Sequence, residues 1–289
     1  MFVTRLLTAV IGVPLMLAVL YWGGMWQGGW PLFLVVAAAV LLGMREFYAG
    51  ASRKDLQPIP LIGYLAALVF LFAVWFARPE FKAGLMIAAL AIAVGGALLV
   101  RVLGAEIAGA TASVGSTVTG FLYVAVLFSF LFRLRLLDLS DTVKGLPAGG
   151  FRAEVGALFL VIAATWLLDT GAYGFGKRFG RVKLTPTLSP HKTVEGAMGG
   201  LMAAVVVAAA VSFWLNMRVI DGVVLGLLIG VVGQLGDLAE SVLKRDMGLK
   251  DFGAVIPGHG GVLDRFDSLL FTMPVAYLYF VIFLPWTGS

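Results

Sequence analysis

A charged segment near the C-terminus, residues 241 to 267, contains the residue types that phosphate chemistry needs. Charged residues make up only 13% of the whole chain, yet they are concentrated here. The Gly-His-Gly-Gly turn at 258–261 would let backbone N–H groups approach a ligand closely. Cations suited to phosphate oxygens and hard carboxylates suited to Mg²⁺ surround it: Lys244, Arg245, Lys250 and Arg265, with Asp251, Asp264 and Asp267. Together these groups indicate phosphoryl or nucleotidyl transfer.

A second polar set lies in the apolar run that precedes this segment. Gln234, Asp237, Ser241 and Lys244 follow one another at spacings of three, four and three residues, which places them on one face of a helix. Glu240 lies one step round from Asp237. A carboxylate inside a membrane helix is by default a candidate for function. The alternative, a structural contact between Asp237 and Lys244, would have to span two turns.

A third set occupies residues 169–196. Residues 171–177 read Gly-x₄-Gly-Lys, which is most of a Walker A loop, but Arg178 replaces the required Ser or Thr and the context is a membrane helix. That nucleotide-binding motif is therefore excluded. Asp169, at the expected end of a helix, could be a substrate-site residue or an interfacial acid. Ser189-Pro190 could belong to the site or could form a simple turn.

These three sets together resemble the phosphatidate cytidylyltransferases, also called CDP-diglyceride synthases. The resemblance rests on Ser241 to Asp267, on Gly-Asp-x-x-Glu-Ser at 236–241 and on Ser-Pro-x-Lys-Thr-x-Glu-Gly at 189–196. The resemblance includes specific motifs over about residues 165–270. Before residue 165 it is limited to the general arrangement of membrane helices. It implies that phosphatidic acid and CTP give CDP-diacylglycerol and pyrophosphate, with attack of the lipid phosphate oxygen on the α-phosphorus of CTP.

The resemblance also implies roles for individual residues. Asp237 and Asp264 would bind Mg²⁺, with Asp169 and Asp267 as further candidate ligands and room for a second cation. The expected catalytic residues are Asp237, Asp264, Lys244, Arg245, His259 and Arg265. The expected substrate- and phosphate-binding residues are Lys177, Ser189, Lys192, Thr193, Glu195, Glu240, Ser241, Lys250, Asp251, Gly260 and Gly261. The alternatives are a flippase or transporter for an anionic lipid, a related lipid-linked kinase, and a cytidylyltransferase that acts on another lipid phosphate.

The composition of the chain predicts an all-α polytopic membrane protein. Of its 289 residues, 61% are hydrophobic, whereas soluble domains are about half apolar. There are no cysteines, so disulfides and Cys-ligated metals are excluded. The net charge of +5 fits cytoplasmic loops rich in Lys and Arg better than it fits a nucleic-acid partner, which is not expected.

About nine apolar runs reach membrane length. They are Leu6–Trp22, Trp30–Met44, Ile59–Phe76, Phe81–Val102, Thr117–Phe132, Val155–Leu168, Ala197–Met217, Val223–Leu243 and Leu269–Leu284. With the N-terminus in the cytoplasm and the C-terminus outside, 14 of the 21 Lys and Arg residues lie on the cytoplasmic side. The charged loops 169–196 and 244–268 then share that side, as a nucleoside triphosphate substrate requires.

These expectations divide the chain by role. Residues 1–150 would form a scaffold with lipid access, and residues 151–289 would form the catalytic region. In the first part, Arg45-Glu46 is the notable polar pair, and it is expected to anchor its helix rather than to act in catalysis. The resemblance further implies a bacterial inner-membrane location, an active site that faces the cytoplasm, and a homodimer.

Overall fold

The structure, a computed structural model, describes residues 18–22, 26–144, 146, 151–253 and 260–285. Most of this part of the chain is helical. The α-helices are α2 (Trp30–Arg53), α3 (Pro60–Trp75), α4 (Pro79–Ala91), α5 (Ala97–Leu103), α6 (Ala110–Gly120), α7 (Leu127–Arg135), α8 (Phe151–Phe179), α9 (Val194–Trp214), α10 (Val219–Asp246) and α11 (Leu263–Leu278). Shorter helical turns are η1 (Trp26–Gly29), η2 (Ile92–Gly96), η3 (Phe121–Val126), η4 (Leu139–Asp141) and η5 (Tyr279–Phe283).

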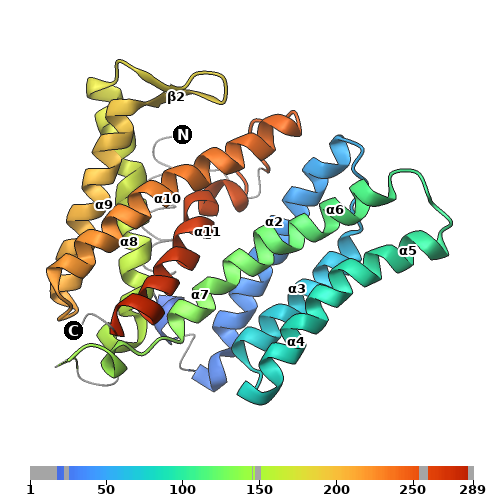
Figure 1. Ribbon diagram of the computed structural model, residues 1–289, viewed down its shortest axis with the longest axis horizontal. Coiled ribbons are helices and arrows are strands. Elements are labelled where there is room, and N and C mark those ends of the chain that lie inside the picture. Colours follow the sequence, from blue (N-terminus) through green and yellow to red (C-terminus); the bar gives the residue numbers. More distant parts are fainter. Residues whose placement is uncertain (1–17, 23–25, 145, 147–150, 254–259, 286–289) are drawn as a thin grey trace. The chain divides into compact units, whose positions relative to one another are not determined.

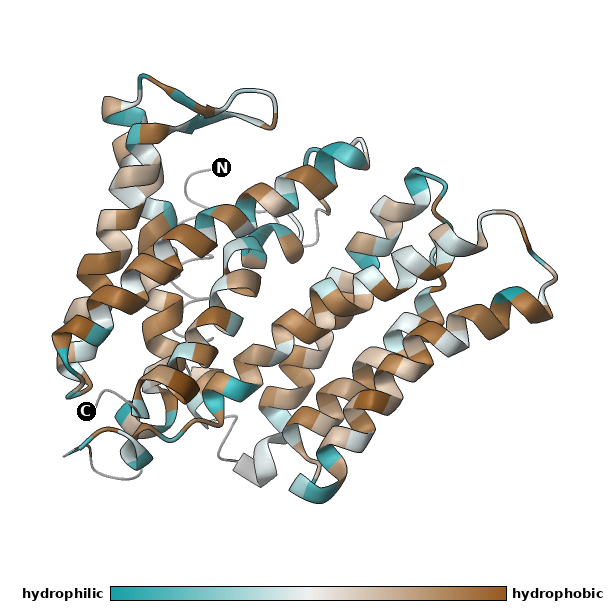
Figure 2. Ribbon diagram, viewed as in Figure 1, coloured by the Kyte–Doolittle hydropathy of each residue, from teal (hydrophilic) through white to brown (hydrophobic). Residues whose placement is uncertain are grey.

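Seven helical segments in the described residues are long and apolar enough to cross a membrane. They are Trp30–Arg53, Pro79–Leu103, Ala110–Arg135, Phe151–Phe179, Val194–Trp214, Val219–Asp246 and Leu263–Phe283. Figure 2 shows the apolar residues along these helices and the hydrophilic ones mainly at helix ends and in connections. At about 1.5 Å per residue, segments of this length span the roughly 30 Å hydrocarbon layer. The all-α polytopic membrane fold is therefore confirmed.

The count of nine helices stays a prediction. The run Ile59–Phe76 corresponds to α3, an apolar helix of 16 residues that is shorter than the other spans. Most of Leu6–Trp22 lies outside the described residues, although 18–22 is helical. The run Thr117–Phe132 is longer than expected, because the helix already begins at Ala110 and continues through the π-helical turn η3.

The helix boundaries correct both predicted loops. The segment 169–196 begins inside α8, which continues to Phe179, so Asp169 lies within a helix and not at its end. The segment 244–268 shortens to 247–262, because α10 ends at Asp246 and α11 begins at Leu263.

Close packing against α9 explains why α8 continues through a glycine-rich sequence. A Cβ at Gly171 would lie 2.8 Å from Ala203 Cβ, and a Cβ at Gly200 would lie 2.7 Å from the carbonyl oxygen of Leu168. Small residues therefore let the two helices approach closely, as they do in many membrane helix pairs. The glycines that suggested a turn in the sequence are helix-packing residues.

A two-stranded hairpin, absent from the sequence prediction, joins α8 to α9. Strand β1 (Lys183–Thr185) pairs antiparallel with β2 (Ser189–Thr193), with Lys183 opposite Thr193 and Thr185 opposite Ser189. Figure 1 shows the hairpin at the shared end of α8 and α9. Ser189 and Pro190 therefore belong to a strand, where an isolated ribbon tolerates the missing N–H of proline.

The chain divides into two compact units. Unit 1 contains residues 1–132 and 244–266, and unit 2 contains residues 133–243 and 267–289. The charged segment 244–266 thus packs with the N-terminal helices. The division by role into residues 1–150 and 151–289 stays a prediction.

A tyrosine fixes the packing of α2 in unit 1. The ring of Tyr48 occupies the space where Gly63 of α3 and Gly120 of α6 have no side chain. Its hydroxyl donates a hydrogen bond to the carbonyl oxygen of Thr117 at 2.8 Å. A buried phenol with a satisfied hydroxyl holds three helices at a defined separation. This contact fixes the part of α2 that carries Glu46.

Candidate active site

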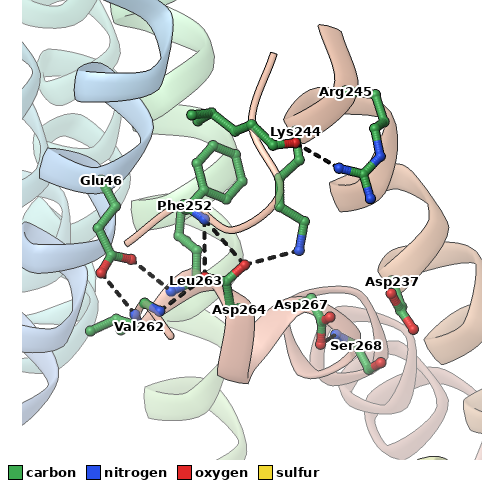
Figure 3. A network of polar contacts seen from close by, with 12 residues as sticks. Glu46, Asp237, Lys244, Arg245, Phe252, Val262, Leu263, Asp264, Asp267 and Ser268 are labelled. Carbon is green, nitrogen blue, oxygen red and sulfur yellow. Dashed lines mark hydrogen bonds and ion pairs between the residues drawn. The ribbon is translucent and has the colours of Figure 1, made fainter. Parts of the chain in front are cut away.

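Asp264 organises the charged segment in unit 1. Its carboxylate accepts hydrogen bonds from Lys244 Nζ at 2.9 Å, from the Gly261 N–H at 2.9 Å and from the Phe252 N–H at 3.0 Å (Figure 3). The side chains of Lys244 and Asp264 are only 11% and 4% exposed. Removing one partner of a buried ion pair is strongly destabilising.

The turn at Gly260 brings the loop amide to this carboxylate. Gly260 has a φ of 89°, a left-handed conformation that glycine adopts without steric strain. The next amide, of Gly261, then donates to Asp264. Gly260 and Gly261 were expected to bind phosphate, but in this structure they shape the turn and complete a protein contact. His259 lies outside the described residues.

The other cations of the segment differ in exposure and partner. Arg245 donates to the carbonyl oxygen of Leu249 at 2.7 Å and so stabilises the start of the loop. Lys250, Asp251 and Arg265 have exposed side chains. These three residues are accessible to an anionic ligand or to its counter-ion, as the sequence predicts.

Asp237 and Lys192 form an ion pair in unit 2. Asp237, on α10, lies 2.6 Å from the ammonium group of Lys192, on β2. Lys244 pairs with Asp264, and the alternative contact between Asp237 and Lys244 stays a prediction. Two residues that the sequence assigns separately to the site are therefore brought together. Lys192 and Lys244 each have an aspartate partner in their own unit.

Two further aspartates of unit 2 belong to the same electrostatic environment. Asp169, on α8, interacts electrostatically with Asp237, Asp267 and Lys192. Its carboxylate lies 3.5 Å from the hydroxyl of Ser268. Several carboxylates around one lysine favour binding of a cation, and carboxylate oxygens are the ligands that Mg²⁺ prefers. Within the described ranges, no three His, Asp or Glu side chains are gathered as a ready-made metal site. The residues have the donor chemistry for Mg²⁺.

Two predicted substrate residues hold the hairpin in place. Thr193 caps α9, because its hydroxyl oxygen accepts the N–H of Gly196 at 3.1 Å. Glu195 accepts the N–H groups of Arg181 at 3.0 Å and Val182 at 3.3 Å. These contacts fix the end of the hairpin that carries Lys192, so Thr193 and Glu195 position a lysine.

The remaining predicted residues lie on α8, β2 and α10. Lys177 is exposed, and its ammonium group lies 5.9 Å from the ring centroid of Tyr173. Ser189 is half-buried in β2. Glu240 and Ser241 are buried in α10, and neither presents an exposed surface to a soluble ligand.

Glu46 was expected to anchor its own helix, but its carboxylate binds the start of α11. Only 5% of Glu46 is exposed, and its carboxylate accepts the N–H of Val262 at 2.9 Å and that of Leu263 at 3.0 Å. The sequence signal was an acid within an otherwise apolar helix. Its partners, more than 200 positions away, could not be read from local spacing.

The fold defines an integral membrane protein, and its two charged clusters contain paired lysines and aspartates. A model of the Cytidylyltransferase family matches residues 3–283, which include every candidate residue named above, and the chain belongs to this family. The chain is 35% identical to the phosphatidate cytidylyltransferase of Synechocystis sp. over 297 residues, or 97% of each chain.

Two shorter matches agree with this assignment. The phosphatidate cytidylyltransferase of Bacillus subtilis is 39% identical over 173 residues, or 59% of each chain. The enzyme of the same name from Staphylococcus aureus is 48% identical over 119 residues, which cover 40% of this chain and 45% of the relative. The resemblance inferred from the motifs is confirmed, and the chain is a multi-pass membrane nucleotidyltransferase.

The two lysine–aspartate pairs lead to a prediction about the lysines. Lys192→Ala and Lys244→Ala should each lower kcat/KM by about ten- to a hundredfold, since a charge-assisted contact contributes about 1.5–3 kcal/mol. Steady-state kinetics per folded molecule would measure this. Lys54→Ala is the matched control, because Lys54 pairs with Asp246 at an exposed site, where ion pairs contribute little. Wild-type kinetics in a folded Lys192 or Lys244 variant would remove that lysine from the site.

Proposed function

We propose that this enzyme transfers the cytidylyl group of CTP to phosphatidate, giving CDP-diacylglycerol and pyrophosphate in a reaction that depends on Mg²⁺. The observation that carries this proposal is the identity with a phosphatidate cytidylyltransferase over 97% of the chain. The paired lysines and aspartates support it, because the reaction needs cations for the triphosphate and carboxylates for a metal ion.

The chemistry requires no protein nucleophile. A phosphate oxygen of the lipid forms a bond to the α-phosphorus of CTP, and the bond from that phosphorus to the bridging oxygen of the β-phosphate breaks. Pyrophosphate leaves with the electron pair of that bond. The protein would position the two phosphates and neutralise charge as it develops. Lys192, Lys250 and Arg265 are suited to the triphosphate and to the leaving pyrophosphate.

Asp237 is the leading metal ligand, with Asp169 and Asp267 as further candidates in unit 2. When bound, Mg²⁺ supplies charge neutralisation and a template for the reacting phosphates. The assignment of Asp264 as a second ligand of Mg²⁺, and the presence of a second cation, stay predictions. In the ligand-free protein the ion pair of Lys192 and Asp237 neutralises both groups. Substrate binding would exchange the partners, giving phosphate to the lysine and the metal ion to the aspartate.

A direct assay tests this proposal. Purified protein would be given CTP, Mg²⁺ and phosphatidate in mixed micelles, and pyrophosphate and CDP-diacylglycerol would be measured, with EDTA and with ATP in place of CTP as controls. Product that requires both CTP and Mg²⁺ is expected. Lipid binding or movement without pyrophosphate release would favour a flippase, and turnover of ATP would favour a lipid-linked kinase.

The proposed location is the bacterial inner membrane, with the site facing the cytoplasm, where CTP is available. The chain is further proposed to form a homodimer. The charge bias of the sequence supports the orientation, because cytoplasmic loops hold most Lys and Arg residues.

This orientation predicts the outcome of cysteine labelling, which is convenient because the native chain has no cysteine. Thr187→Cys, at the exposed tip of the hairpin, should react with a membrane-impermeant maleimide only after the cytoplasmic side is opened. Glu80→Cys, exposed at the start of α4, should react in intact cells. The opposite pattern would reverse the topology.

A further inference from the structure

One face of α2 contacts the described parts of the loop between α10 and α11, residues 247–253 and 260–262. Gly43, Glu46 and Gly50 follow at spacings of three and four, so they lie on the same side of the helix. A Cβ at Gly43 would lie 3.1 Å from the side chain of Leu263, and one at Gly50 would lie 2.8 Å from Met247 Sδ. Both ends of the loop therefore contact α2, and Glu46 lies between these two contacts.

The carboxylate of Glu46 binds the beginning of α11. The first amides of a helix have no partner within the helix and carry partial positive charge. Glu46 accepts two of them, from Val262 at 2.9 Å and from Leu263 at 3.0 Å, at a site that is almost fully buried. A charged acceptor for two buried donors is among the stronger hydrogen-bonded arrangements in proteins.

Three successive amides are divided between two carboxylates. The Gly261 N–H donates to Asp264, while the N–H groups of Val262 and Leu263 donate to Glu46 (Figure 3). The orientation of this short segment sets the direction of the Asp264 side chain, which in turn binds Lys244. A displacement of the Glu46 carboxylate would therefore shift the backbone of residues 261–263, and this shift would change the positions of the Asp264 and Lys244 side chains.

Two glycines of the loop leave the space that Glu46 occupies. A Cβ at Gly261 would lie 2.6 Å from Glu46 Oε2, and a Cβ at Gly253 would collide with Glu46 Oε1. Neither position can carry a side chain without moving the carboxylate. The sequence pattern suggested that Gly261 would face a ligand, whereas the structure shows both glycines enclosing an acid of the N-terminal half.

We propose that Glu46 is a positioning residue for cytidylyl transfer, which holds the charged loop and the start of α11 so that Asp264 and Lys244 are correctly oriented. This inference rests on the proposed function. It gives the N-terminal half a direct part in organising the site. Glu46 acts through backbone amides and does not contact the reacting atoms.

The test is Glu46→Gln in the full-length protein, with Glu80→Gln as the matched control at an exposed carboxylate. Gln keeps the size of the side chain but replaces one acceptor oxygen with a donor, which would face a backbone N–H. We expect kcat to fall by about tenfold or more with little change in KM for CTP, since orientation is lost rather than binding. The control should keep both constants.

Amide hydrogen exchange provides a readout that needs no substrate. In Glu46→Gln, peptides that contain residues 260–266 should exchange faster, while peptides of α8 and α9 should exchange as in the wild type. The exchange measurement can be interpreted even if the wild-type protein does not make CDP-diacylglycerol. It therefore distinguishes a failure of the proposed function from a failure of the proposed contact between Glu46 and the loop. Unchanged exchange at 260–266, or faster exchange along the whole chain, would overturn the positioning role, as would normal kcat.

A second variant keeps the proposal testable if Glu46→Gln does not fold. Gly261→Ala adds a single methyl group that must displace the Glu46 carboxylate, so it should reproduce the loss of kcat and the local increase in exchange. Where both single variants fold, the double variant should be little worse than either, because both disrupt the same contact. Additive losses would contradict the shared mechanism.

Discussion

Asp237→Asn should abolish most CTP-dependent turnover while the protein still folds and inserts. Asn keeps the shape of the side chain but removes the negative charge, and Mg²⁺ prefers anionic oxygen ligands. The loss of one such electrostatic group at a reacting phosphate is expected to lower turnover by about a hundredfold or more. The measurement is turnover per folded molecule against Mg²⁺ concentration. Higher Mg²⁺ should partly restore activity if weakened metal affinity is the main defect.

The same helix offers a control for this substitution. Asp221, near the start of α10, is buried and bonds both to Arg218 and to the hydroxyl of Tyr279 at 2.7 Å. Asp221→Asn should lower thermal stability, because it leaves a buried ionic contact unsatisfied, but it should leave the Mg²⁺ dependence of the folded fraction unchanged. Near-normal turnover in Asp237→Asn, or an equal change of Mg²⁺ dependence in both variants, would sink the metal assignment.

The fold was predictable to the extent that membrane physics dictates it. Apolar runs of about 20 residues must be helical in a bilayer, because every backbone N–H and C=O needs a partner within the segment. The course of α8 beyond Leu168 was not predictable in this way. Glycines at 171, 174 and 176 favour turns in soluble proteins, whereas here Gly171 and Gly176 pack against α9.

The site residues were predictable by type, but their partners were not. Lys192 and Asp237 are 45 positions apart, and no periodicity relates a strand residue to a residue of α10. Glu46 and its amide partners are still further apart in the sequence. The sequence also marks Asp264 as an acid suited to a metal ion, but it cannot show that three donors already occupy its oxygens.

Asp264→Asn should cause the other large effect, because it affects both the chemistry and the loop. The carboxylate accepts donors on both oxygens, whereas an amide offers one acceptor, and its NH₂ group would face either a backbone N–H or the ammonium group of Lys244. Loss of the charge also breaks the buried ion pair with Lys244, and breaking such a pair costs about 3–5 kcal/mol. We therefore expect both lower thermal stability and the loss of most turnover per folded molecule.

A double variant separates these two effects of Asp264→Asn. Adding Lys244→Met removes the buried cation of the broken ion pair while it keeps a long side chain, so thermal stability should recover in part relative to Asp264→Asn alone. Turnover should not recover, because the lysine and the aspartate act as a unit and both are then missing. Thermal unfolding of each variant and turnover corrected for the folded fraction would decide this. Recovery of turnover together with stability would show that Asp264 and Lys244 serve only the fold. An ion pair with a purely structural role can be replaced by an apolar contact, whereas an ion pair that the reaction needs cannot.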